Sequence, residues 1–277
     1  VRHLLIDILF ITICAVISGA NNLKAVAMYA MRKKDWLTEV LELPEGVPSY
    51  PTLWTIFALL DPTVLEKSFV HWVKSQVNLK KGDVVSIDGK AQRGTAKRGQ
   101  PHSFVHIVSA WAATNHLTLG QLKVDGKSNE IPAIPKLLDV LDVSGTTVTI
   151  DAMGCQTEIA EKIVDRGAEY VLALKGNQGA LADEVENYFI QADAVDFEGV
   201  PCDAVGSKTS GHGRVEKREI YVTEEIDWLP QKDEWKNLKS IVMVRSKRLL
   251  PDQPTSIERR YYISSLPACA LDIARVI

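Results

Sequence analysis

The feature that most constrains the fold is a change of hydrophobic periodicity near residue 80. Before it, apolar residues recur at helical spacing, and after it short β-branched runs alternate with amphipathic stretches. Helices are predicted over residues 4–18, 23–41, 49–60 and 61–77. Lys80-Lys-Gly-Asp83 interrupts the helical pattern, so we predict a helical domain over 1–80 and an α/β domain over 81–277.

The α/β part has a defined order of elements. Strands are predicted over 83–88, 104–112, 117–124, 146–150 and 170–174, and helices over 128–141, 158–166 and 181–192. Three sequential strands, interpreted as an antiparallel meander, precede strand–helix–strand crossovers. This order is expected of an RNase H-like mixed sheet. Residues from about 193 to 265 return to strand patterns and are interpreted as a β-rich insertion. We expect the final helix, from Ala268, to be truncated at Ile277.

Composition leaves the class of partner open. The net charge of −3 neither supports nor excludes nucleic acid, because a local basic face binds phosphates on an acidic protein. Four scattered cysteines have no metal-ligand spacing and fit a reducing cytosol. The apolar run Ile8–Ile17 is similar to a secretion signal, but it is too short to span a bilayer and follows Asp7 directly. We favour a buried helix.

Two aspartates are the strongest candidates for chemistry. Asp88 and Asp151 are each predicted to lie just past the end of an apolar strand, where an unpaired carboxylate is costly unless a cation compensates it. Oxygen ligands suit Mg²⁺, and two such ions would activate a water or a 3′-hydroxyl for attack on a phosphodiester. The alternative is that each aspartate only caps a turn, but the pair in this strand order favours the metal site.

Glu130 is a third candidate from its position. It opens the helix after the third strand, where RNase H enzymes supply a metal-site carboxylate, so we predict that it points toward Asp88 and Asp151. The equally weighted alternative is a first-turn glutamate that complements the helix dipole.

Five motifs occur in one order along the chain: Ser86-Ile-Asp-Gly-Lys90, Lys127-Ser-Asn-Glu130, Thr149-Ile-Asp-Ala-Met153, Ala173-Leu-Lys-Gly-Asn-Gln178 and Gly211-His-Gly-Arg214. Together they resemble insertion-sequence DDE transposases, most of all the H-repeat-associated type found with bacterial Rhs elements. Each motif alone is weakly specific, and their shared order is strong. The resemblance covers nearly the whole chain, including the helical leader and Arg259-Arg-Tyr-Tyr-Ile-Ser-Ser265.

The resemblance implies roles for the two aspartates. Asp88 would be the first acid of the triad and Asp151 the second, with Mg²⁺, or Mn²⁺ in its place, as cofactor. The third acid would be a glutamate in a His-Trp-x-x-Glu-Asn segment on the helix after Tyr-Ile-Ser-Ser, and no such segment precedes Ile277. Glu216 and Glu258 do not match, so no third acid is assigned. The resemblance also implies double-stranded DNA as partner, a homo-oligomer at synapsis, and a bacterial, nucleoid-associated cytoplasmic protein without a membrane role.

The predicted DNA-binding residues gather around these acids. They are Lys90, Arg93, Lys97 and Arg98 in a loop expected after Asp88, Lys127, the group Lys175, Asn177 and Gln178, and His212 with Arg214. A basic loop beside a metal site suits phosphate contact, although a solvated charged loop needs no function. His212 is alternatively an acid–base group.

The leader offers a further hypothesis. Helices over 49–77 are interpreted either as a helix-turn-helix with Thr52, Trp54 and Thr55 facing DNA, or as core packing by Trp54, Phe57, Leu59 and Leu60, which is the more frequent meaning of such a stripe.

Three functions are compatible with these sequence features. The first is an active transposase in a longer natural chain, the second a catalytically inactive remnant that only binds DNA, and the third a structure-specific nuclease. A small-molecule enzyme is disfavoured because no phosphate loop, dinucleotide fingerprint or nucleophile elbow occurs.

Overall fold

The computed structural model describes residues 2–92, 95, 105–124, 130–211, 214–249 and 254–277. The chain forms two compact units, Val1–Ser68 and Phe69–Ile277. The change of unit falls within helix α5 (Pro62–Gln76). The domain limits of 1–80 and 81–277 stay a prediction from the sequence.

The first unit contains helices α1 (Leu5–Ile17), α2 (Leu23–Arg32), α3 (Lys34–Val40) and α4 (Tyr50–Leu59), together with the start of α5. The single helix expected over 23–41 is wrong, because the backbone leaves helical geometry at Lys33 (φ −106°, ψ 16°). Residues 31–36 contribute no buried side chain, so the core does not hold a continuous helix there. Ser49 caps α4 as predicted and accepts a hydrogen bond from the Thr52 amide.

The apolar first helix packs one face into the core of this unit. Ile8 and Ile11 are fully buried, and the buried Asp7 carboxylate accepts a hydrogen bond from the Leu43 amide at 3.1 Å. That bond offsets part of the cost of burying a carboxylate. Within the described residues, no helix combines the length and apolar character needed to cross a bilayer. On α4 the structure exposes Trp54 and leaves Phe57 partly buried, so the stripe expected to pack in the core does so only in part.

The second unit is built on one nine-stranded sheet with the order β3-β2-β1-β4-β5-β9-β8-β7-β6. Its first strands are β1 (Val84–Gln92), β2 (Val105–Ala112), β3 (Leu117–Val124), β4 (Thr147–Ile150) and β5 (Glu169–Leu174). The meander β1–β2–β3 is antiparallel, while β1–β4 and β4–β5 are parallel. The predicted mixed α/β sheet, with three antiparallel strands followed by crossovers, is therefore confirmed.

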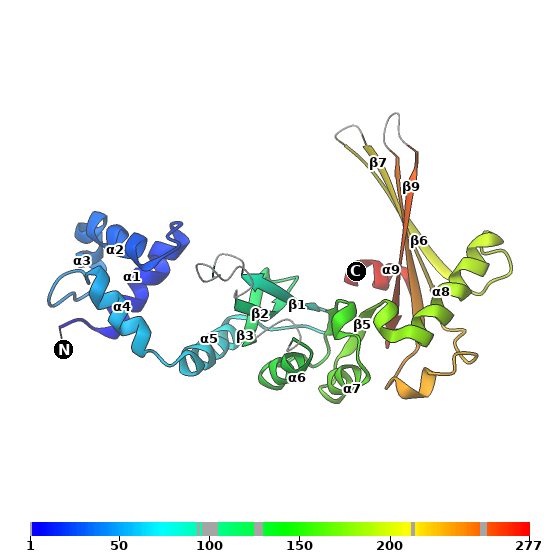
Figure 1. The fold of residues 1–277 in the computed structure, drawn as a ribbon, viewed down its shortest axis with the longest axis horizontal. Coiled ribbons are helices and arrows are strands. Elements are labelled where there is room, and N and C mark those ends of the chain that lie inside the picture. The colour runs from blue at the N-terminus through cyan, green and yellow to red at the C-terminus, as the bar shows by residue number, and fades with distance from the viewer. Residues whose placement is uncertain (1, 93–94, 96–104, 125–129, 212–213, 250–253) are drawn as a thin grey trace. The chain divides into compact units, whose positions relative to one another are not determined.

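The β-rich region continues this sheet. It contains β6 (Asp203–Gly211), β7 (Arg214–Thr223), β8 (Ser240–Leu249) and β9 (Ser256–Ser264). Strand β9 pairs antiparallel with β5, and the other three follow in antiparallel register. Figure 1 shows these strands extending well beyond the neighbouring helices. We call this extension the arm, meaning residues 207–211, 214–218, 246–249 and 256–260.

Strand alternation gives the sheet two different faces. Helices α6 (Glu130–Val140), α7 (Thr157–Asp165) and α8 (Gly179–Ala194) share a core with the sheet, in which Ile87, Leu172 and Ile263 are buried. Helix α9 (Ala270–Val276) packs on the opposite face through a second cluster with Val171 and Val242. We call these the helix-covered face and the α9 face.

Candidate active site

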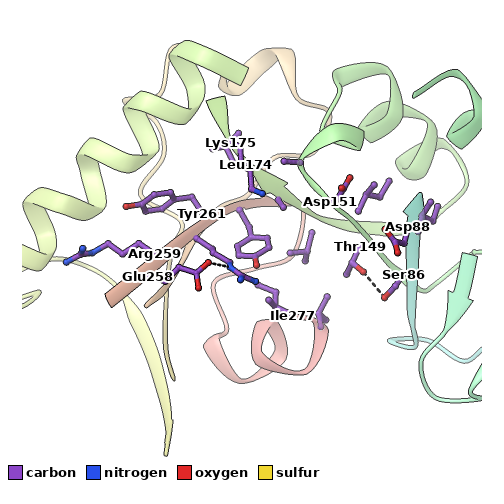
Figure 2. A pocket seen from close by; sticks show the side chains of 18 of the residues that line it. Ser86, Asp88, Thr149, Asp151, Leu174, Lys175, Glu258, Arg259, Tyr261 and Ile277 are labelled. Carbon is purple, nitrogen blue, oxygen red and sulfur yellow. Dashed lines mark hydrogen bonds and ion pairs between the residues drawn. The ribbon is translucent and has the colours of Figure 1, made fainter. Parts of the chain in front are cut away.

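A pocket of about 760 Å³ lies on the α9 face where the parallel pairing ends. Asp88 from β1 and Asp151 after β4 both line it (Figure 2). Their convergence follows from the register. Ile87 is paired with Ile150 in the parallel ladder, so each aspartate is the next residue on neighbouring strands. Both residues are exposed.

The local setting of Asp88 differs from the prediction. Asp88 does not follow the end of a strand, because β1 continues to Gln92 through its pairing with β2. What ends after Ile87 is the pairing with β4. Asp88 therefore caps no turn. Asp151 does cap one, since its Oδ1 accepts a hydrogen bond from the Met153 amide at 3.2 Å at the start of the short 3-10 turn η3 (Ala152–Gly154).

The pocket supplies some, but not all, of the oxygen ligands that a hard cation such as Mg²⁺ needs. Two exposed carboxylates, with the hydroxyl groups of Ser86 and Thr149 nearby in the lining, are the oxygen donors that Mg²⁺ prefers. Among the described residues, no cluster of three or more His, Cys, Asp or Glu side chains has metal-binding geometry. The two aspartates thus fit a metal site that needs a further ligand.

Glu130 opens α6 as predicted, but its carboxylate lies on the helix-covered face. A Cβ placed on Gly89 would stand 2.2 Å from Glu130 Oε2, so this carboxylate packs directly against the backbone of β1. It is 5% exposed, and its Oε1 lies 3.3 Å from His106 Nδ1. Asp88 projects from the other face of the same strand. Glu130 shares a small cavity with Asp151, and its catalytic role stays a prediction.

No role was predicted for His106 from the sequence. Its partner in the β1–β2 register is Ala91, two residues from Gly89, and this places the imidazole on the helix-covered face beside Glu130. Only the pairing register reveals that contact, because the two residues are 24 positions apart in the sequence.

Two of the predicted basic residues lie near the aspartates. Lys175 follows β5 and lines the pocket (Figure 2). Lys90 lies inside β1, not in a loop, because pairing with β2 extends past it, and it is exposed on the same face as Asp88.

Asn177 and Gln178 hold the turn that follows Asp151. The Asn177 side-chain amide donates to the Ala152 carbonyl at 2.6 Å, and that of Gln178 donates to the Cys155 carbonyl at 2.7 Å. Both side chains thus connect the turn after β5 to the segment after β4. Their predicted DNA contacts stay a prediction.

Most of the other predicted DNA-binding residues cannot be related to the pocket, because the structure does not describe them. Arg93, Lys97, Arg98, Lys127 and His212 fall outside the described residues. The backbone of Arg214 begins β7, opposite Gly211.

Strand β9 contributes residues to the pocket that had no predicted role. Glu258, Arg260 and Tyr262 line it from alternate positions, and Arg260 Nε donates to Glu258 Oε1 at 2.8 Å. This hydrogen bond and the carboxylate charge hold the pKa of the Arg260 guanidinium above its ordinary value. Val276 and Ile277 at the end of α9 complete this side. The alternation of polar residues was visible in the sequence, but the pairing of β9 with β5 was not.

Comparison with known families identifies the class of protein. The model of a family described as Transposase DDE domain matches residues 63–253, and that of an associated domain, DDE_Tnp_1-associated, matches residues 1–73. The chain therefore belongs to the DDE transposase family.

Comparison with individual proteins shows which members of the family this chain resembles. It is 36% identical to an H repeat-associated putative transposase, YhhI, of Escherichia coli K12, over 100% of this chain and 74% of that protein. It is also 36% identical to the putative transposase YncI of Escherichia coli O157:H7, over 100% and 71%. An uncharacterized protein from the dhlA 3′ region of Xanthobacter autotrophicus is 42% identical over 95% of this chain and 88% of its own length. The resemblance to the H-repeat-associated type is thus confirmed.

Proposed function

We propose that this chain carries the metal-dependent DNA strand cleavage and strand transfer of an insertion-sequence element. The observation that carries the proposal is the convergence of Asp88 and Asp151 in one open pocket, through adjacent positions of a parallel strand pair. These side chains would hold Mg²⁺ or Mn²⁺ in a two-metal site. When bound, the ions supply activation of the attacking oxygen and stabilisation of the leaving oxygen.

The strand order supports an RNase H-like core. The segment β3-β2-β1-β4-β5 has the antiparallel meander and parallel crossovers predicted for such a core, with one acid on its first strand and one after its fourth. Strands β6–β9 extend it at the β5 edge.

The third acid is proposed to come from residues that follow α9 in a longer chain. Val276, the last residue of α9, and Ile277 after it line the pocket with the two aspartates, so a following segment would start beside them. YhhI and YncI extend beyond the 74% and 71% of their lengths that this chain spans. Glu258 also lines the pocket, but Arg260 engages its carboxylate.

The partner proposed for this site is double-stranded DNA, at element ends and target. Lys175, which lines the pocket, and the exposed Lys90 would contact phosphates beside the scissile bond, together with the remaining predicted contacts. Association of copies at synapsis and a nucleoid-associated, cytoplasmic location belong to the same proposal.

Metal binding tests the proposal on the 277-residue chain itself. Asp88→Asn and Asp151→Asn keep the side-chain volume and remove the charge, so each variant should lose Mn²⁺ binding measured by electron paramagnetic resonance. Asp227→Asn is the matched control, because its carboxylate is paired with Lys232 on the surface, outside the pocket. Undiminished Mn²⁺ affinity in either pocket variant would remove that aspartate from the metal site.

A second function, DNA binding without cleavage, is favoured by the lack of a three-carboxylate cluster among the described residues. The two functions separate in a cleavage assay with Mn²⁺. A chain extended to the length of its relatives should cut DNA, and the 277-residue chain should bind DNA but cut poorly. Inactivity of the extended chain would favour the binding protein, and efficient cutting by the shorter chain would refute our assignment of the third acid.

A further inference from the structure

Two hydroxyl groups stand beside the carboxylates of the pocket that Asp88 and Asp151 line. Ser86 in β1 and Thr149 in β4 are partners in the parallel ladder, and each precedes its aspartate by two positions. Because side chains alternate along a strand, Ser86 projects from the same face of β1 as Asp88. Both hydroxyl residues line the pocket together with the aspartates (Figure 2). The sheet therefore presents a row of two hydroxyls directly next to the candidate metal site.

One hydrogen bond joins the two hydroxyls, and its direction matters. Thr149 Oγ1 donates to Ser86 Oγ at 3.0 Å in a partly buried contact. The Thr149 proton is thus used, whereas Ser86 acts only as an acceptor in this bond. Among the residues that the structure describes, none accepts the proton of the Ser86 hydroxyl. Ser86 is therefore a donor held in place on the wall of an open pocket, without a protein acceptor.

The alternative is a hydroxyl pair that has no role beyond a half-exposed strand surface. Threonine is common in strands because its branched side chain suits them, and solvent takes a spare proton at such a position. Valine has the same branched shape, however, so packing alone does not call for the hydroxyl of Thr149. The bond from Thr149 also holds the Ser86 oxygen in one place, which a solvated serine does not need.

A divalent cation between two carboxylates needs more oxygen partners than these side chains supply. Within the described part of the chain, no third His, Cys, Asp or Glu joins the two aspartates in metal-binding geometry. Mg²⁺ gives up its waters reluctantly and usually keeps several of them when few carboxylates bind it. Protein groups that hydrogen-bond to the ligands of a metal tune its affinity. A fixed hydroxyl donor beside Asp88 is such a group.

We propose that the Ser86 hydroxyl donates a hydrogen bond to a hydration water of the divalent cation held by Asp88 and Asp151, and that Thr149 is the positioning residue that fixes this hydroxyl. The inference rests on the proposed function, because it takes the pocket as a metal site. It deepens that function by assigning part of the cation's hydration to the paired strands β1 and β4.

The Mn²⁺ affinity of the 277-residue chain, measured by electron paramagnetic resonance without DNA, tests this assignment. Ser86→Ala removes the donor and should weaken Mn²⁺ binding about tenfold, the lower end of the range for groups that hydrogen-bond to metal ligands. Thr149→Val keeps the side-chain shape but removes the bond that fixes Ser86, so it should weaken binding by a smaller factor. Thr149→Ser keeps a hydroxyl and should bind as the unaltered chain does. Ser246→Ala is the matched control, because this partly exposed serine of β8 lies outside the pocket lining.

A double variant separates positioning from a general loss of structure. If Thr149 acts through Ser86, then Ser86→Ala/Thr149→Val should bind Mn²⁺ no more weakly than Ser86→Ala alone. Additive losses would overturn the positioning role of Thr149. A loss of affinity in Thr149→Ser equal to that in Thr149→Val would overturn it as well, because the hydroxyl would then be irrelevant.

Failure of this inference is distinguishable from failure of the proposed function. If Asp88→Asn abolishes Mn²⁺ binding while Ser86→Ala keeps the affinity of the unaltered chain, the role of Ser86 is refuted and the proposed metal site stands. If the unaltered chain binds no Mn²⁺, the proposed metal site fails on this chain, and the inference fails with it.

Discussion

Replacing Gly89 by alanine tests the contact that holds β1 against α6. The new Cβ would lie 2.2 Å from Oε2 and 2.6 Å from Cδ of Glu130, so the carboxylate must retreat by about 1 Å to restore ordinary contact. That movement also disturbs its 3.3 Å contact with His106. Overpacking of a buried site costs about 1–3 kcal/mol, and a lost hydrogen bond adds about 1 kcal/mol.

We therefore expect Gly89→Ala to lower the free energy of unfolding by about 2–4 kcal/mol. In thermal unfolding followed by circular dichroism, this corresponds to a fall in Tm of about 5–15 °C for a unit of this size. Gly206→Ala on β6 is the control, because its new Cβ has its nearest neighbour at 3.8 Å, and it should change stability by less than about 0.5 kcal/mol.

A double-mutant cycle assigns the cost to Glu130. The variant Gly89→Ala/Glu130→Ala removes the atoms that the new methyl group meets, so it should be more stable than the sum of the single effects predicts, by about 1–2 kcal/mol. Additive effects, or a Gly89→Ala variant as stable as the control, would show that the Glu130 carboxylate does not rest against β1.

Three further predictions concern stability and reactivity. Ser49→Ala removes the N-cap of α4 and should cost about 1 kcal/mol in urea unfolding; an unchanged midpoint would contradict the cap. The pKa of Asp193 lies below its ordinary value of 3.8. Burial by itself would raise this pKa, but the hydrogen bond from Arg259 and the charges of Arg245 and Arg259 outweigh the effect of burial. The stability difference from Asp193→Asn should thus be full at neutral pH and close as pH falls below about 4 in urea titrations; a pH-independent difference would contradict the ion pair. Burial raises the pKa of Cys155 to about 12, so its thiol should resist alkylation at neutral pH until the protein unfolds, and modification of the folded chain would refute this.

The sequence predicted most of the order of elements, because buried strands and amphipathic helices differ in periodicity. It did not predict that β1 runs past Asp88. An Asp-Gly pair is typical of a turn, yet Gly89 lies in an extended strand, where its missing side chain admits Glu130. Strand β6 was not singled out either, because eight of its nine residues are exposed and it lacks apolar alternation.

The part of the candidate site that depends on local sequence patterns was predictable. Asp88 and Asp151 were found from acids next to apolar runs in a recognisable strand order. The share of β9 in the pocket depends on its pairing with β5, a contact between distant segments that no local pattern encodes. The same holds for the separation of Glu130 from Asp88, which depends on the face of β1 against which α6 packs.

The unbroken sheet has a mechanical consequence. From β1 to β7 every neighbouring pair of strands is joined by backbone hydrogen bonds in fixed register. The arm and the two aspartates therefore belong to one continuous sheet. A displacement of the arm would therefore reach β5 through β8 and β9, and from β5 it would reach β4, the strand that precedes Asp151.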